Sequence, residues 1–219
     1  MKKSILSIAL STTLFATTAL TTSQANAIEG LSANVGLVSQ YLFRGIAQTS
    51  TASASAGVDY ENGGFYVGTW AADVQDGIEV DFYGGYSLET ESGFGFSIGG
   101  TTYQYTGDFD SAYNEVNLGL SYDFFSLSYN VGKHSKDASI GIESESDYDF
   151  LSATFEYEGF YATYGTWGKD FDGDYFEFGY GTDVAGFDLG VSLIANSKEL
   201  DLETGEGDET LVFSIAKSF

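Results

Sequence analysis

The sequence predicts an all-β fold, a transmembrane antiparallel up-and-down β-barrel of about twelve strands, within a range of roughly 10 to 14. Three observations predict it: short segments that alternate apolar and polar residues, connections that alternate between short and long, and a high aromatic content. The chain has 16 Tyr, 18 Phe and 2 Trp, with 28 Gly and no Pro. A soluble exported β-sandwich would also show alternation, but its core has room for only part of these aromatic residues. A barrel in lipid instead turns its apolar side chains outward.

The first 27 residues predict a secretory signal peptide. Lys2 and Lys3 form a charged start, a stretch diluted by Ser and Thr follows, and Ala25-Asn26-Ala27 forms an A-x-A cleavage signature. A transmembrane helix would need about 20 predominantly apolar residues. We therefore expect a signal peptide at 1–27, cleaved after Ala27, and a barrel at 28–219.

The charge of the chain after residue 27 is strongly negative. All 32 acidic residues lie there, with six of the eight basic ones, which gives a net charge of −26. Such a surface repels nucleic acid, so we exclude nucleic-acid binding. Disorder is also excluded, because disordered acidic chains contain few aromatic residues. Cysteine is absent, and with it disulfides, thiolate metal sites and a cysteine nucleophile.

Alternation of period two marks each expected strand. Ile78, Val80 and Phe82 share one face of a segment, and Glu79 and Asp81 share the other. The same arrangement recurs along the chain. We expect strands at 31–44, 48–60, 64–73, 77–88, 93–105, 112–123, 125–132, 147–157, 160–168, 174–182, 186–196 and 209–219.

The connections between these segments alternate in kind. The short ones lie at 61–64, 89–93, 123–124, 157–159 and 182–186. The longer, acidic or polar ones lie at 106–112, 132–146, 168–174 and 196–209, and 73–77 is an exception because it is short on the long side. Outer-membrane barrels have short periplasmic turns and longer extracellular loops. An even number of strands then leaves both termini on the periplasmic side.

The end of the chain resembles the carboxy-terminal sorting signal of bacterial outer-membrane barrels. Alternating apolar residues precede a final Phe219, the residue type that usually ends that signal. Lys217 departs from the pattern, although its ammonium can snorkel at the membrane edge. The resemblance implies recognition by the barrel-assembly machinery and a location in the bacterial outer membrane, among its lipid and lipopolysaccharide.

Four blocks resemble a more specific family. YLFRGIAQT at 41–49, GFYVGTW at 64–70, EVDFYGGY at 79–86 and YNEVNLGLSYD at 113–123 are similar to successive blocks of the TorF family of porin-like proteins. The similarity covers most of 31–219, and the first block is the most distinctive. Ala47 stands where Ser is expected. Because that family is itself of unknown function, the resemblance implies fold and location more than activity.

Arg44 is the only arginine in the chain. If Tyr41 and Phe43 face lipid, alternation turns Arg44 into the lumen, and this is also the cheaper side, because arginine facing lipid costs about 2–4 kcal/mol at mid-bilayer. Alternation also places five carboxylates on the inner wall, where they could surround Arg44. They are Asp59, Glu79, Asp81, Glu115 and Glu177.

Two interpretations of this group stay open. A ring of acidic side chains with one arginine could form a constriction that favours cations. The same group could instead be a structural salt-bridge network, because eight-stranded barrels are filled by side chains and only porins of about 16 strands hold a wide channel. Large aromatic residues that alternation turns inward count against an open pore. They are Tyr66, Trp70, Tyr83, Tyr103 and Tyr161.

Metal and cofactor chemistry has weak support. Asp170, Asp172 and Asp174 are spaced like the start of a calcium loop, but Gly stands at position 4 and Gly181 occupies position 12, where the motif needs Glu. We expect no cofactor and no specific metal site. The acidic loops could bind divalent cations that bridge them to lipopolysaccharide phosphates.

Catalysis has little support either. The only histidine is His134, next to Ser135, and adjacency in sequence is not the geometry of a catalytic triad. We expect His134 to be a solvated loop residue and the protein not to be an enzyme. The predicted function is passive diffusion of small hydrophilic solutes, leaning towards cations. The alternative is a closed barrel with a structural or adhesion role through its acidic loops.

Overall fold

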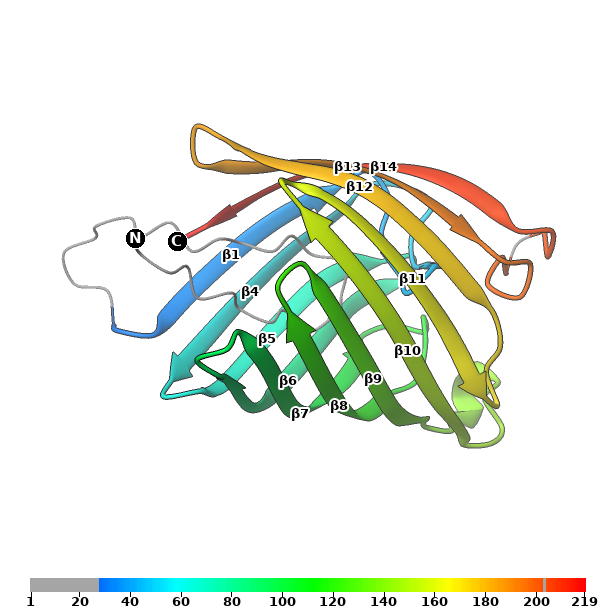
Figure 1. The fold of residues 1–219 in the computed structure, drawn as a ribbon. Coiled ribbons are helices and arrows are strands. Elements are labelled where there is room, and N and C mark those ends of the chain that lie inside the picture. The colour runs from blue at the N-terminus through cyan, green and yellow to red at the C-terminus, as the bar shows by residue number, and fades with distance from the viewer. Residues whose placement is uncertain (1–27, 203) are drawn as a thin grey trace.

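A computed structural model describes residues 28–202 and 204–219, so the expected signal peptide lies outside the described residues. The chain forms a closed barrel of twelve antiparallel strands (Figure 1). Two further short strands lie inside it. The wall strands are β1 (Leu31–Val38), β4 (Ser53–Asn62), β5 (Phe65–Val74), β6 (Gly77–Glu89), β7 (Phe94–Tyr105), β8 (Tyr113–Tyr122), β9 (Phe125–His134), β10 (Ser146–Tyr157), β11 (Phe160–Lys169), β12 (Asp174–Val184), β13 (Phe187–Asn196) and β14 (Asp208–Ser218).

Each wall strand pairs with its neighbours in the sequence, and β1 pairs with β14 to close the barrel. Asn34 lies opposite Ser218 and Val38 opposite Ser214 in that closing pair. This up-and-down antiparallel order confirms the predicted fold class. A 3-10 helix, η1 (Ala138–Ile140), lies in the β9–β10 loop. In the part of the chain that the structure describes, no helix has the length and apolar character to cross a membrane.

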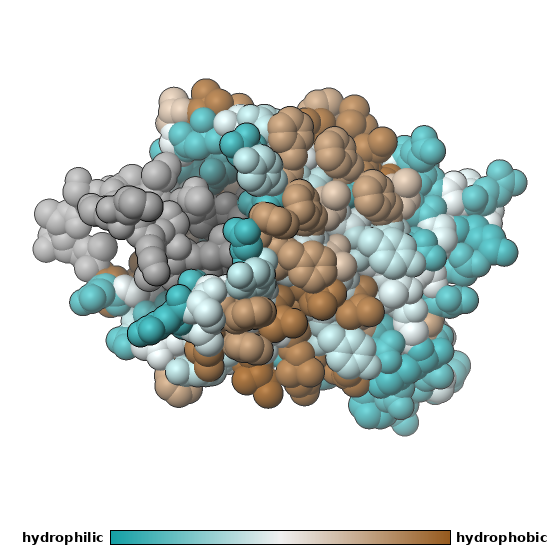
Figure 2. All heavy atoms as spheres, viewed as in Figure 1, coloured by the Kyte–Doolittle hydropathy of each residue, from teal (hydrophilic) through white to brown (hydrophobic). Residues whose placement is uncertain are grey.

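The alternation of the sequence becomes an apolar outer wall. On β6, Phe82 is 52% exposed and Glu79 is 0% exposed, and the same division recurs around the barrel. Figure 2 shows the result as a brown belt of apolar side chains with teal, hydrophilic ends. A continuous apolar belt of this kind suits lipid rather than water, because soluble proteins rarely expose large contiguous apolar patches.

The short-turn end of the barrel carries aromatic pairs and tight turns. Ring pairs such as Phe94–Tyr122 lie there at 4.3 Å between centroids. Three of the turns put two successive residues at positive φ, Gly63-Gly64, Glu158-Gly159 and Ala185-Gly186. Positive φ at both central residues is what a type I′ hairpin turn requires.

The prediction of a strand over 31–44 is wrong for the second half of this range. β1 ends at Val38, and β4 begins at Ser53 rather than at residue 48. The residues between them turn into the barrel, where β2 (Leu42–Phe43) pairs with β3 (Ile46–Ala47). Tyr41 is therefore 7% exposed and does not belong to a lipid-facing girdle. We call residues 39–52 the inserted hairpin.

The interior packs around the inserted hairpin. Two clusters of buried side chains form there, and each contains hairpin residues. The first consists of Leu42, Tyr148, Phe150, Trp167, Tyr175, Ile194, Leu200 and Val212. The second consists of Tyr41, Trp70, Ala72 and Val74. The core thus lies in the lumen, towards the end of the barrel that carries the long loops.

Candidate functional site

The tip of the inserted hairpin is a two-residue turn. Arg44 has φ 49° and Gly45 has φ 86°, the same pattern of positive φ as in three wall turns. Glycine is required at the second position for a further reason. A Cβ on Gly45 would lie 2.8 Å from the Cβ of Tyr175 and 2.9 Å from a methyl of Leu200. The tip is therefore seated against β12 and the β13–β14 loop.

The base of the hairpin is held by backbone bonds. Ser39 N–H donates to the carbonyl of Phe213 at 2.8 Å, and Gln75 N–H donates to the carbonyl of Gln48 at 2.9 Å. Inside the hairpin, Tyr41 N–H donates to Thr49 Oγ1 at 3.0 Å. These contacts tie the hairpin to β14 on one side and to the β5–β6 loop on the other.

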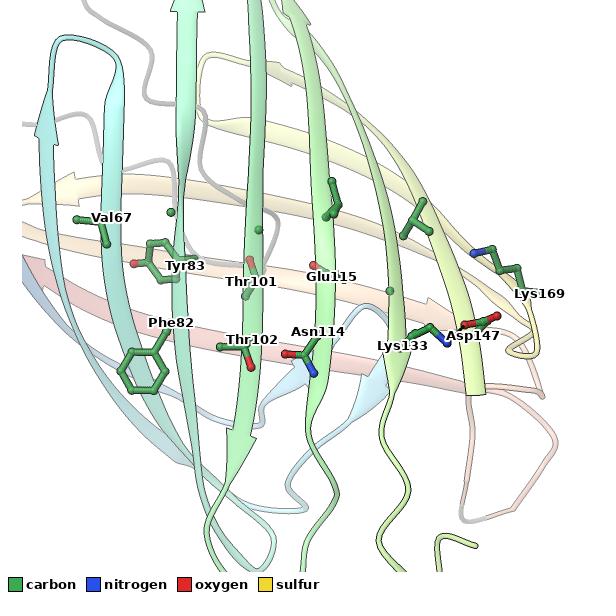
Figure 3. A pocket seen from close by; sticks show the side chains of 15 residues that line it. Val67, Phe82, Tyr83, Thr101, Thr102, Asn114, Glu115, Lys133, Asp147 and Lys169 are labelled. Atoms are coloured by element: carbon green, nitrogen blue, oxygen red, sulfur yellow. Dashed lines mark ion pairs between the residues drawn. The ribbon is translucent and has the colours of Figure 1, made fainter. Parts of the chain in front are cut away.

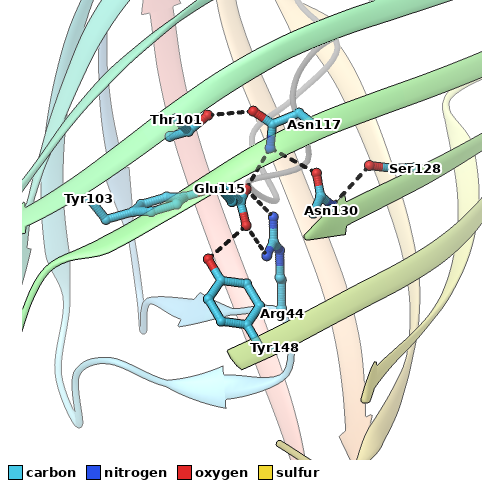
Figure 4. A network of polar contacts seen from close by, with 8 residues as sticks. All are labelled: Arg44, Thr101, Tyr103, Glu115, Asn117, Ser128, Asn130 and Tyr148. Atoms are coloured by element: carbon cyan, nitrogen blue, oxygen red, sulfur yellow. Dashed lines mark hydrogen bonds and ion pairs between the residues drawn. The ribbon is translucent and has the colours of Figure 1, made fainter. Parts of the chain in front are cut away.

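Arg44 makes a two-pronged ion pair with Glu115 on β8. Nη1 donates to Oε2 at 2.9 Å and Nη2 donates to Oε1 at 2.8 Å. Three more donors converge on the same carboxylate: the hydroxyl of Tyr103 at 2.8 Å, the amide of Asn117 at 2.6 Å and the hydroxyl of Tyr148 at 3.0 Å (Figure 4). Charge-assisted forked pairs of this kind are the strong hydrogen bonds of proteins.

Aromatic rings enclose the guanidinium. Its central carbon lies 4.8 Å from the ring centroid of Phe43, 4.5 Å from Phe150 and 5.5 Å from Trp167. The indole N–H of Trp167 also donates to the Arg44 carbonyl at 3.1 Å. Burial has the largest single effect and lowers the pKa of Arg44, but Glu115, Tyr103 and Tyr148 together raise it by more, so the net pKa lies above its ordinary value and the group stays charged.

The network continues along the inner wall beyond Glu115. Asn117 Nδ2 donates to Asn130 Oδ1 at 2.9 Å, and Asn130 donates to Ser128 Oγ at 3.1 Å. Thr101 Oγ1 donates to Asn117 Oδ1 at 2.8 Å. Figure 4 shows these side chains reaching across three neighbouring strands, β7, β8 and β9. Buried polar networks whose members are satisfied rigidify the structure around them.

The structure divides the expected acidic cluster into separate groups. Among the described residues, Arg44 has an ion pair with Glu115 only. Each of three other carboxylates accepts a tyrosine hydroxyl instead. The pairs are Asp59 with Tyr83 at 2.5 Å, Glu79 with Tyr41 at 2.7 Å and Glu177 with Tyr161 at 2.7 Å. The fifth, Asp81, is 2% exposed, and its Oδ1 has no hydrogen-bond partner among the described residues.

The five expected lumen aromatics all point inward. Trp70 and Tyr103 are 7% and 3% exposed. Tyr66, Tyr83 and Tyr161 are half-buried, and the side chains of the last two bond to carboxylates of the wall. The tyrosines thus serve as hydroxyl donors as much as fillers. Alternation in the sequence predicts which side of the wall a tyrosine faces. It does not predict which carboxylate accepts a hydrogen bond from the hydroxyl.

Two of the three loop aspartates, Asp170 and Asp172, cap the backbone of loops. Asp170 Oδ2 accepts Asp147 N–H at 2.8 Å, and Asp172 Oδ1 accepts Gly173 N–H at 2.8 Å. Asp174 begins β12, and its N–H donates to Ser197 Oγ at 3.0 Å. Within residues 28–202 and 204–219, no three His, Cys, Asp or Glu side chains form a group that could hold a metal ion.

His134 differs from expectation. It ends β9, its side chain is 12% exposed, and its Nε2 lies 2.8 Å from Asp110 Oδ1. The ring stacks on Tyr113 at 4.1 Å between centroids. The prediction that His134 is a solvated loop residue is wrong, because the β7–β8 loop folds over the end of β9 and covers the imidazole.

A hollow of about 820 Å³ lies on the wall formed by β5 to β11. Most of its lining side chains face outward by alternation, including Phe82, Thr102 and Asn114. Lys133 and Asp147 lie together at one end of it (Figure 3), with Nζ and Oδ1 3.0 Å apart. This hollow belongs to the outer face and is distinct from the lumen.

The final residue also lies on the outer face. Phe219 is 62% exposed, and its backbone N–H donates to the Ala33 carbonyl at 2.9 Å. The ammonium of Lys217 lies 5.5 Å from its ring centroid. The last residue thus extends the closing pair of the barrel.

The closed wall, the apolar belt and the inserted hairpin define a closed up-and-down β-barrel with an apolar outer face. Residues 22–219 match a family described as "Bacterial protein of unknown function (Gcw_chp)", and the chain belongs to that family. The match carries this description rather than the TorF name that the sequence blocks suggested. No curated protein matches the chain.

Two solved structures share the fold. The KdgM porin is 9% identical with a TM-score of 0.56, over 86% of this chain and 99% of that one. A structure described as "Unveiling the Mechanism Behind the in-meso Crystallization of Membrane Proteins" is 11% identical with a TM-score of 0.60, over 86% of this chain and 83% of that one. At such identities the likeness is one of fold.

Proposed function

We propose that the protein is an outer-membrane channel for the passive diffusion of small hydrophilic solutes, with a preference for cations. The observation that carries this proposal is an inner wall of buried carboxylates crossed by a single inserted hairpin. A closed barrel with an apolar outside and a polar inside is the architecture of outer-membrane channels. The shared fold with the KdgM porin supports the same class.

The cation preference follows from the charge balance of the inner wall. Arg44 neutralises Glu115, and the other described ion pairs involve lysines or His134 at strand ends or in loops. Four further inner carboxylates have no cationic partner among the described residues. They are Asp59, Glu79, Asp81 and Glu177. Rings of acidic side chains concentrate cations and repel anions.

The inserted hairpin supplies the constriction. Its base is attached near β1 and β14, and its tip pairs with Glu115 on β8, on the far side of the lumen. Solutes would pass beside the hairpin, within the electrostatic field of the inner carboxylates, of which Glu79 and Asp81 are buried. The hairpin thus brings the diffusion path close to the acidic side chains.

A second candidate is a closed barrel with a structural or adhesion role. The two clusters packed around the hairpin favour it, because they fill much of the lumen with aromatic and aliphatic side chains. In this case the acidic loops would make the contacts, through divalent cations bridged to lipopolysaccharide phosphates. In both cases Phe219 would serve recognition by the assembly machinery.

Neither proposal includes an enzymatic step. His134 has the carboxylate partner Asp110, but its ring stacks on Tyr113. Among the described residues no serine hydroxyl bonds to this imidazole, and a nucleophile would need that contact.

The test is single-channel current from refolded protein lacking residues 1–27, in a planar bilayer with a potassium chloride gradient. We expect discrete steps and a reversal potential that favours potassium. The double variant Glu79→Gln/Asp81→Asn should reduce this preference, and the loop variant Glu143→Gln should leave it unchanged. Arg44→Ala should increase both the conductance and the preference for potassium, because it frees the hairpin and leaves Glu115 unpaired.

Absence of steps from protein that shows heat-modifiable gel mobility would refute the channel and favour the closed barrel. A reversal potential that favours chloride would refute the cation preference alone.

A further inference from the structure

Glu79 and Asp81 form a buried acidic pair on β6. They are two residues apart on one strand, so both side chains point into the barrel. They are 0% and 2% exposed. Glu79 Oε2 and Asp81 Oδ1 are buried, and neither has a hydrogen-bond partner among the described residues. The carboxylate of Glu79 also interacts with the hydroxyl of Tyr105, its cross-strand neighbour on β7, so Asp81 is the member of the pair that lacks a donor.

Aromatic side chains surround Asp81. Trp70 on β5 and Tyr103 on β7 are its direct cross-strand neighbours. Directly opposed residues have Cβ atoms about 4.5–5.5 Å apart. Tyr83 follows Asp81 on the inner side of β6, and Tyr41 of the hairpin packs on Trp70 at 5.7 Å between centroids.

The tyrosines around Asp81 direct their hydroxyls elsewhere. Tyr41 donates to Glu79 at 2.7 Å, Tyr83 donates to Asp59 at 2.5 Å, and Tyr103 donates to Glu115 at 2.8 Å. Asp81 is therefore left among ring surfaces with no hydroxyl directed to it. Ring faces carry the negative end of the aromatic quadrupole, so they attract cations as a carboxylate does.

No side chain of the described chain supplies the missing positive charge. Arg44 is committed to Glu115. Lys133 pairs with Glu145 and Asp147 at the rim, and Lys217 lies over Phe187 on the outer face. Burying carboxylates without a cation or a donor is expensive. A bound cation would remove this cost.

We propose that Glu79 Oε2 and Asp81 Oδ1 bind a small, weakly hydrated monovalent cation of the size of potassium or ammonium, enclosed by the rings of Trp70, Tyr83 and Tyr103. The proposal deepens the proposed function, on which it rests for the path by which the cation enters. Calcium fits poorly, because it takes six to eight oxygen ligands. The described residues offer no group of three acidic or imidazole ligands.

The experiment uses thallium(I), which has nearly the size of potassium and quenches indole fluorescence on contact. Refolded protein lacking residues 1–27 is titrated in detergent micelles with thallium(I) nitrate at constant ionic strength. The chain has two tryptophans, and we expect saturable quenching of one of them. This component should be lost in Trp70→Phe, and potassium should compete with it, whereas calcium at equal ionic strength should not.

Variants locate the site. Asp81→Asn should weaken thallium binding about tenfold, because one of two buried charges is lost. Glu79→Gln should do the same. Asp188→Asn, which removes an inward-facing carboxylate of β13 near the opposite end of the barrel, should leave binding unchanged. Each variant is first shown to be folded by its heat-modifiable gel mobility.

Linear, unsaturable quenching of the wild-type protein would overturn the proposal, as would equal saturation in folded Asp81→Asn and Glu79→Gln. Competition by calcium as strong as that by potassium would also overturn it. The micelle titration needs no current. A barrel that binds thallium and conducts nothing therefore refutes the channel alone, and one that conducts without saturable quenching refutes this site alone.

Discussion

Glu115 and Asp81 lie on the same inner wall, at 5% and 2% exposure, in opposite environments. Glu115 accepts hydrogen bonds from five donor atoms, two of them on Arg44. Asp81 Oδ1 accepts none from the described residues. The comparison shows that burial alone does not define the role of a lumen carboxylate. Glu115 fastens the hairpin, whereas Asp81 is left available to a ligand.

The largest effect is expected for Arg44→Ala. It leaves Glu115 buried without its cation, and breaking a buried ion pair costs about 3–5 kcal/mol. We expect a loss of that size in the free energy of unfolding, measured by urea titration in micelles with gel mobility as the readout. Arg44→Lys should recover only part of it, because an ammonium cannot form the fork. A loss equal to that of a surface substitution would show that the pair does not hold the hairpin.

The next largest effect is expected for Gly45→Ala. The added Cβ would meet Tyr175 at 2.8 Å, at a backbone φ of 86°. We expect a loss of about 2–3 kcal/mol from backbone strain and overpacking together. Gly186→Ala is the matched control, with φ 79° at the same turn position and no neighbour within 4 Å of the added Cβ. Equal losses in the two variants would show that the hairpin tip is not seated as described.

Tyr41→Phe makes the environment of Glu79 more similar to that of Asp81. It removes the hydroxyl that donates to Glu79 Oε1 at 2.7 Å and leaves the ring on Trp70 in place. An orphaned buried acceptor costs about 1–3 kcal/mol, and we expect the same unfolding titration to show a loss in the lower half of this range. Tyr129→Phe, which removes an outward hydroxyl bonded to Asp149, should cause no measurable change. Equal effects of the two would argue against a buried Glu79.

The smallest effect, and the only one of opposite sign, is expected for Asp81→Asn. In a buffer without potassium or ammonium, removing an unpartnered buried charge should stabilise the barrel by about 1 kcal/mol. Glu115→Gln in the same buffer should destabilise it, because Arg44 then loses its anion. A destabilisation by Asp81→Asn as large as that by Glu115→Gln would show that Asp81 has a partner after all.

Most of the wall could be predicted from the sequence. Alternation depends only on the two faces of a strand, so it placed Glu79, Glu115 and Glu177 inside and Phe82 and Phe213 outside. The alternation of short and long connections predicted the up-and-down order of the strands. Partners could not be predicted this way, because the Tyr83–Asp59 and Tyr161–Glu177 contacts depend on stagger between strands.

The inserted hairpin escaped prediction for a physical reason. Tyr41 and Phe43 keep the period of two beyond Val38, so the strand pattern continues through residues that leave the wall. Two-residue turns usually carry Asn-Gly or Asp-Gly, and Arg44-Gly45 is an unusual pair for positive φ. The available signal was length, because a strand over 31–44 exceeds the span of about ten residues that a tilted membrane strand needs. Arg44 does lie in the lumen, but at the tip of a turn instead of on a strand.

The seat of the hairpin has a consequence for the order of assembly. Arg44 finds Glu115 71 residues later in the chain, and its carbonyl receives the Trp167 indole after 123 residues. The seat is therefore built from β8, β10, β11 and β12, while the hairpin itself is among the first segments to be made. Contacts between such distant segments form late, because long loops must close first. We therefore expect Leu42 and Phe43 to stay exposed during folding until most of the wall has formed. The hairpin then docks as one of the last steps.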